Sequence, residues 1–239
     1  MNYYLITKIS FVVLTGICLY AIFKGLKFGL RNFEEGKRKT IIRRYWIFLF
    51  IWLIGSSAAS LSGFTSDFSQ LPPRPAIFLV IPAIVLVFLL RSKTTQQILK
   101  NIPPKYLINI QMFRIPVEIL LWFLLLANIT PIQMTFEGRN FDILVGLSAP
   151  LVAFLAFSND QLNRRLIIGW NIFGLLLLSN ILVIAILSMP TPLRVFMNEP
   201  ANTEVGNFPI IFLPAVLVPI AYYFHAFSLK QMMLLPSKG

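Results

Sequence analysis

Long apolar runs separated by short polar stretches recur along the whole chain, and this pattern predicts membrane-spanning helices. A helix needs roughly 17–25 residues to cross a hydrocarbon core about 30 Å thick, and most of the runs satisfy that length. The third run is short, and we expect it to borrow residues from Leu71–Pro75 before it. The seven runs are Tyr4–Phe23, Tyr45–Gly63, Ala76–Leu90, Tyr106–Ala127, Phe141–Phe157, Leu166–Met189 and Phe208–Leu229.

The basic residues between these runs predict how the bundle is oriented. Sixteen of the 21 Lys and Arg residues lie on one side of the predicted membrane, and only three lie in the opposite loops. Because Lys and Arg accumulate in cytoplasmic loops, we expect an all-α integral membrane protein in a cell membrane, a seven-helix transmembrane bundle with the N-terminus outside and the C-terminus cytoplasmic. The basic stretches are Lys24–Arg44, Arg91–Lys105, Ser158–Arg165 and the C-terminal tail, and the three exceptions are Arg74, Arg139 and Arg194.

The composition agrees with a membrane protein and narrows its chemistry. Charged residues make up only 13% of the chain, whereas soluble domains carry about 25%. A net charge of +12 would suggest nucleic acid in a soluble protein, but here the basic residues lie between apolar runs, so the lipid bilayer is the expected partner. The single Cys18 allows no intrachain disulfide, and the single His225 excludes sites built from several histidines of one chain. We expect no metal and no cofactor.

The chain is expected to form a single domain, residues 1–239, with a weak internal repeat. Its longest loops hold only about 20 residues, which is too few to fold alone. The sequence RRYWIFLFIWLIGSS in the second run resembles RRLIIGWNIFGLLLLSN in the sixth, and the third run resembles the seventh. Together these similarities suggest a 3+1+3 arrangement with the fourth run as a linker. Chance similarity between apolar segments built from few residue types is the alternative.

Two charged residues lie inside the fourth run, in the stretch QMFRIPVEILLWFLLL. If the helix starts at Lys105, Arg114 lies roughly 13 Å deep at about 1.5 Å per residue, close to the middle of the membrane. Glu118 follows one turn later on the same face, so the two can pair, and Gln111 joins that face. Polar residues inside a span face the protein or a water-filled cavity and are candidates for function.

An ordinary helix end is the other interpretation of these charges. The sequence NIPPKYLINIQ before them is compatible with a short segment in the headgroup region, and the span would then begin near Met112. Arg114 would sit among the headgroups, with Glu118 one turn deep and neutralised by it. A structural ion pair buried in the bundle is a third interpretation, and the sequence leaves all three open.

The sixth and seventh runs supply two further candidates, Asn171 and His225. Asparagines in spans usually form hydrogen bonds between helices. A neutral histidine bonded to a neighbouring helix is the plainer interpretation of His225, and a proton-carrying histidine is the sharper one. Arg114, Asn171 and His225 all fall in the predicted inner half of the membrane. If their helices adjoin, they would line a polar cavity that opens toward the cytoplasm.

The loop sequence TFEGRNFD, residues 135–142, concentrates charges on the predicted outer side. We interpret it as a solvated loop followed by a helix start. Asn140 would cap the fifth span and Asp142 would lie in its first turn, where acidic residues are favourable.

Three classes of function remain open. The first is a small-solute or proton-coupled transporter, or a solute-binding protein, whose site is built from Arg114, Glu118, Gln111, Asn171 and His225. In it Arg114 would attract an anionic group, Glu118 would set the charge and His225 would carry a proton. The second is a non-catalytic subunit or sensor that assembles with membrane partners or with itself. The third, an enzyme acting on a lipid-like substrate, is least favoured because the sequence holds no nucleotide-binding, zinc-hydrolase or serine-hydrolase motif.

Overall fold

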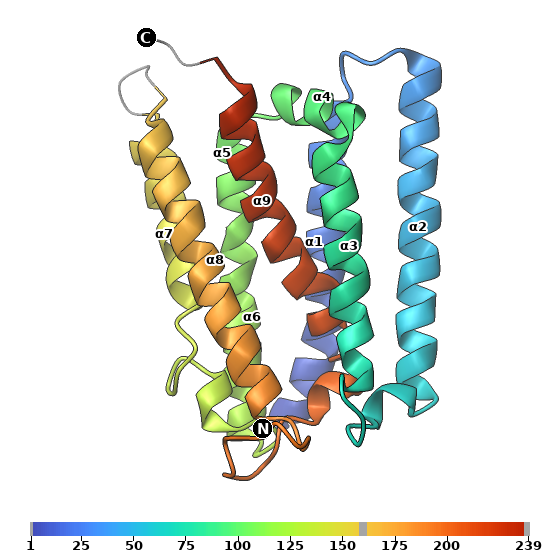
Figure 1. The fold of residues 1–239 in the computed structure, drawn as a ribbon, viewed down its shortest axis with the longest axis vertical. Helices are drawn as coiled ribbons and strands as arrows, with labels where there is room; N and C mark the ends of the chain where they lie inside the picture. Colours follow the sequence, from blue (N-terminus) through green and yellow to red (C-terminus); the bar gives the residue numbers. More distant parts are fainter. Residues whose placement is uncertain (1, 158–161, 237–239) are drawn as a thin grey trace.

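The computed structural model describes residues 2–157 and 162–236, and this part of the chain is helical, without β-strands (Figure 1). It contains six helical stretches that are long and apolar enough to cross a membrane. Short 3₁₀ turns lie at Phe64–Ser66, Arg74–Ala76, Ile110–Phe113, Ile132–Met134 and Glu204–Gly206. The α-helices are α1 (Tyr3–Gly29), α2 (Glu35–Leu61), α3 (Ile77–Arg91), α4 (Lys93–Asn101), α5 (Pro104–Asn109), α6 (Arg114–Leu126), α7 (Ile143–Leu155), α8 (Arg164–Leu187) and α9 (Val218–Leu234).

The basic stretches contain more helix than the sequence pattern predicts. Helix α1 continues to Gly29 and α2 begins at Glu35, so most of the predicted loop Lys24–Arg44 is helical. The start of α2 holds an ion pair between Lys39 and Glu35 at 2.7 Å. The stretch Arg91–Lys105 contains the amphipathic helix α4. The end of α1, the start of α2 and the helix α4 can form here because their polar side chains reach water while the backbone stays hydrogen-bonded. The third span does borrow residues before it, since the turn Arg74–Ala76 leads directly into α3.

The fifth apolar run departs most from prediction. We expected a full span over Phe141–Phe157, but α7 has 13 residues and covers only part of the bundle's height beside α5 and α8 (Figure 1). The rest of this crossing is an irregular segment, residues 127–142, which runs from the end of α6 back into the bundle. Irregular backbone is tolerated at membrane depth only where protein or a cavity surrounds it, and Asn180 of α8 donates to the Arg139 carbonyl at 3.0 Å.

Helix α9 lies at the centre of the bundle, packed against α3, α4, α5 and α8. It is preceded by a π-helical turn, Leu213–Leu217. Pro219 has no N–H to donate to the carbonyl of Ala215, four residues earlier. That free carbonyl accepts a hydrogen bond from the indole Nε1 of Trp52 at 2.8 Å. A proline in α9 thus creates the acceptor that holds α2 against the bundle.

The predicted orientation and repeat stay predictions. Helix α1 begins at one end of the bundle and α9 ends at the other, as any odd number of passes of the chain would give (Figure 1). The helices that would correspond in a 3+1+3 repeat, α1 and α7, have 27 and 13 residues.

Candidate binding site

The site is organised around Arg114, which begins α6 near the middle of the continuous helical stretch Pro104–Leu126. Its side chain is only 2% exposed. The interpretation that placed it among lipid headgroups is therefore wrong. The predicted pairing with Glu118 is also wrong, because the guanidinium binds Asp142. Nε donates to Oδ2 at 2.6 Å and Nη2 donates to Oδ1, a bidentate geometry that suits arginine and a carboxylate.

Asp142 reaches Arg114 because the irregular segment brings it into the bundle. The expected solvated loop at residues 135–142 is wrong for Asn140 and Asp142, which are both buried. Asn140 does not cap α7; its Oδ1 accepts from the Asp142 backbone N–H at 3.1 Å, which turns the chain toward Arg114. Asp142 precedes the first residue of α7 and forms no side-chain cap there.

The third nitrogen of Arg114 fixes the state of His225. Nη1 lies 2.9 Å from Nε2 of His225, and because arginine only donates, Nε2 accepts. The imidazole proton is then on Nδ1, which lies 2.9 Å from Oδ1 of Asn171. Asn171 continues the chain by donating to Oγ of Ser228 at 2.9 Å. His225 is therefore a neutral histidine bonded to a neighbouring helix, as the plainer interpretation predicts, and Asn171 forms the interhelical hydrogen bond expected of it.

Close packing holds the imidazole in place. A Cβ at Gly174 of α8 would lie 2.3 Å from Cε1 of His225, so only glycine allows the ring to approach this closely. The indole of Trp170, one turn earlier, lies 5.5 Å from the ring, centroid to centroid. The polar chain from Asp142 to Ser228 is thus a rigid part of the α8–α9 interface.

Glu118 lies beside this chain but has a separate partner. Both of its carboxyl oxygens accept from the Nδ2 of Asn140, at 2.8 and 2.7 Å, and the same Nδ2 donates to the Met134 carbonyl at 3.0 Å. The side chain is buried. Among the ion pairs of the described residues, none includes Glu118. Its carboxyl is therefore held by an amide and has no cation of its own.

The remaining predicted residue, Gln111, lies apart from these groups. Its Nε2 donates to the carbonyl of Ala221 in α9 at 3.2 Å, and its Oε1 is buried without a partner. The structure therefore brings together Arg114, His225 and Asn171, places Glu118 next to them, and leaves Gln111 as a contact between the fourth span and α9.

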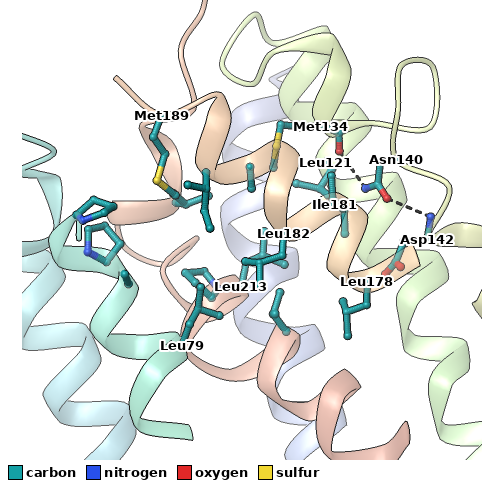
Figure 2. Close-up of a pocket in the computed structure, with 18 of the residues that line it drawn as sticks. Leu79, Leu121, Met134, Asn140, Asp142, Leu178, Ile181, Leu182, Met189 and Leu213 are labelled. Carbon is teal, nitrogen blue, oxygen red and sulfur yellow. Dashed lines mark hydrogen bonds between the residues drawn. The ribbon is translucent and has the colours of Figure 1, made fainter. Parts of the chain in front are cut away.

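A cavity of about 480 Å³ ends on Glu118, Asn140 and Asp142. The rest of its lining is apolar and comes from α3, α6, α8, the π-helical turn and the loops at the end where α1 begins. Figure 2 shows Asn140 and Asp142 at one end of the cavity, with leucine, isoleucine and methionine side chains such as Leu178, Leu182 and Leu213 around the remainder. This cavity lies toward the end of the bundle where α1 begins, away from the basic stretches, and Arg114, Asn171 and His225 are not among its lining residues.

Two helices on the side of the cavity do not close against each other. Helices α3 and α8 both pack on α9 and make no extensive contact with one another in the described chain. The cavity lies between them, with Leu79 on one wall and Leu182 and Ala185 on the other.

Hydrogen-bonded loops cover the end of the cavity. Oγ of Ser60 donates to the carbonyl of Gly206 at 2.7 Å, and Oγ1 of Thr65 donates to the same oxygen. Further along, Asp67 accepts from the hydroxyl and the backbone N–H of Ser69 and pairs with Arg74 at 2.9 Å. These hydrogen bonds and the Arg74 charge hold the pKa of Asp67 below its ordinary value. These interactions thus fix the loop before α3 over the cavity, with the Asp67 carboxyl in its charged form.

Sequence reasoning missed two residues of the site, Asn140 and Asp142. Their sequence is typical of a loop and a helix start, and their burial depends on the chain reversal in residues 127–142. The one signal for Asp142 is that a buried arginine needs a carboxylate partner.

No family model, curated protein or solved structure matches this chain. Function is therefore inferred from the geometry of the cavity and of the polar groups at its end.

Proposed function

We propose that this protein is a membrane transporter that binds an amphipathic small molecule in the cavity, with its polar head at Glu118 and its apolar body among the leucines. One observation carries the proposal: a deep apolar cavity that ends on a buried polar cluster of Glu118, Asn140 and Asp142. Ligand sites typically have volumes of about 300–1,000 Å³ and a mostly apolar lining with a few polar groups that fix orientation.

The broken fifth crossing, formed by residues 127–142 and α7, supports transport over simple storage. Substrate sites in many transporters lie near the middle of the membrane, where a discontinuous helix meets irregular backbone. Here the polar end of the cavity lies where the irregular segment 127–142 meets α7. As part of the proposal, we keep the cell membrane and the orientation expected from the basic stretches, so the end of the cavity under the loops lies on the outer side.

The charges at the polar end indicate what kind of head group fits. The nitrogens of Arg114 that face polar groups are bonded to Asp142 and His225, so its charge is not free to attract an anion as the sequence had suggested. Glu118 and Asp142, both acidic, line this end of the cavity. A head group with hydrogen-bond donors or a positive charge therefore fits better than an anionic one.

The gap between α3 and α8 supports entry from the membrane. A largely apolar ligand concentrates in the acyl chains, and Leu79 and Ala185 lie on the two walls that it would pass. The route requires no opening of the hydrogen-bonded loops above the cavity. The ligand would thus be a lipid-soluble amphiphile.

Photolabelling in lipid nanodiscs tests the proposal, with a diazirine derivative of octanol as the probe. We expect labelling of Leu182 or Leu213 that an excess of octanol suppresses, whereas labelling of lipid-facing residues is not suppressed. The variant Ala185→Trp should abolish the suppressible labelling by filling the cavity. The matched control Val183→Trp lies on the exposed face of the same helix and should label as the parent does. Absence of suppressible labelling in the parent would refute the proposal.

A further inference from the structure

We infer that Glu118 exchanges a proton for a cationic ligand: it holds a proton while the cavity contains no cation, and releases it when the ammonium of an amphipathic amine binds. The inference rests on the proposed function and deepens it, since it names the head group and the ion exchanged. The inference follows from the charges around Glu118, from the polar residues that line the cavity end and from the position of Glu118 within the proposed span.

The first step is a charge balance at the polar end of the cavity. On α6, Arg114 faces Glu118 from four residues earlier, and ahead of α7 Asp142 cancels the charge of Arg114 through their ion pair. Two titratable side chains of α9 also lie at this end. His225 is neutral because Nε2 accepts from Arg114. Tyr222 contributes a hydroxyl that lies 3.2 Å from the hydroxyl of Ser179.

An ionised Glu118 would consequently leave one uncompensated negative charge. A lone charge buried in protein or hydrocarbon is strongly unfavourable, and the described ion pairs offer this carboxyl no cation. The site without a ligand is therefore neutral when Glu118 carries a proton. A bound cation can replace that proton without changing the net charge of the site.

The oxygens at the cavity end match a primary ammonium. An ammonium group has three N–H donors, and Glu118, Asn140 and Asp142 all line this end of the cavity. Asn140 holds the Glu118 carboxyl in place from the protein side. The apolar body of the amine would extend away from these groups, along α8 toward Leu182 and Leu213 (Figure 2).

The exchange is balanced in atoms and charge. The O–H bond of the Glu118 carboxylic acid breaks, its electron pair stays on the oxygen, and the proton passes to water. The incoming ammonium keeps its three protons and forms hydrogen bonds to the carboxylate. No electrons are transferred and no covalent bond to the ligand is made.

Calorimetry in nanodiscs tests the exchange, with octylamine as the cationic probe and octanol as the neutral one. An alkyl ammonium resembles lysine, whose pKa is about 10.4, so octylamine is charged at pH 7. Titrations at one pH in two buffers of different ionisation enthalpy give the number of protons released. We expect about one proton per octylamine bound and none per octanol. Octylamine affinity should rise up to about tenfold per pH unit, as linkage to one proton requires, while octanol affinity stays constant.

Two variants complete the test. Glu118→Gln should lose both the proton release with octylamine and the rise of octylamine affinity with pH. Glu137→Gln is the matched control. Glu137 is an exposed residue of the irregular segment 127–142 and accepts a hydrogen bond from Trp122, so this variant should behave as the parent does. Octylamine that fails to bind, or binds without releasing a proton, overturns the exchange. Octanol binding then decides separately whether the proposed function stands. If Glu118→Gln does not fold, the proton count measured with the parent protein is sufficient to decide between exchange and its absence.

Discussion

Arg114 and Asp142, 28 residues apart in the chain, form a bidentate ion pair inside the bundle, with 2% and 5% of their surfaces exposed. The pair joins the start of α6 to the point where the irregular segment 127–142 becomes α7. Because one partner belongs to irregular backbone, the ion pair fixes that backbone inside the bundle. It also leaves Glu118 without a cation, which gives the cavity its acidic end.

The ion pair should show strong energetic coupling. Arg114→Ala or Asp142→Ala alone leaves a buried unpaired charge and should cost about 3–5 kcal/mol of unfolding free energy. The double variant removes both charges, so its loss should be well below the sum of the single losses. Unfolding of all four proteins in detergent micelles gives the cycle. Additive losses would show that the two side chains do not interact in the folded protein.

The glycine beside the imidazole should be intolerant of a methyl group. Gly174→Ala places a Cβ against the His225 ring, and overpacking of this kind costs about 1–3 kcal/mol. Gly169 of the same helix has open space around its Cβ position. Gly169→Ala should be neutral or stabilising by up to about 1 kcal/mol, because alanine is the better helix former. Equal effects of the two variants on the unfolding midpoint would argue against the close packing.

The sequence predicted that Arg114, Asn171 and His225 form one group only if their helices adjoin, and the structure brings the three together. Helical periodicity puts each on a face of its span, and the cost of a polar group in hydrocarbon turns those faces inward. Helices were also predictable, since apolar length is a strong signal. The partner of Arg114 was not predictable from the sequence, because Asp142 follows a loop-like sequence. Its burial depends on a chain reversal that no periodicity encodes.

The position of the cavity was beyond sequence reasoning for a related reason. The burial of Arg114 in the bundle follows from its place in an apolar run, but the free volume depends on which helices fail to meet. Helices α3 and α8 leave a gap because both pack on α9, and apolar runs such as theirs carry no information about neighbours. Polar residues marked the end of the cavity, whereas its walls consist of leucines that resemble any lipid-facing surface.

A proline and a tryptophan on different helices should be coupled through one carbonyl. Trp52→Phe removes the hydrogen bond to the Ala215 carbonyl, and losing such a bond costs about 0.5–1.5 kcal/mol. Pro219→Ala supplies a backbone N–H that can bond the same carbonyl within α9. In that background, Trp52→Phe should cost less. A cycle measured by unfolding in detergent that gives no coupling would show that the indole does not depend on the proline.

The orientation of the bundle can be tested with single cysteines at its two ends. The basic stretches predict that Lys37, at the start of α2, is cytoplasmic and that Met197, in the loop after α8, is external. Both are exposed, Met197 by 71%. In a Cys18→Ala background, which removes the native thiol, Met197→Cys should react with a membrane-impermeant maleimide in intact cells. Lys37→Cys should react only after permeabilisation. The reverse pattern would invert the orientation and turn the cavity toward the cytoplasm, whereas labelling of both from outside would contradict the fold, which places the two residues at opposite ends of the bundle.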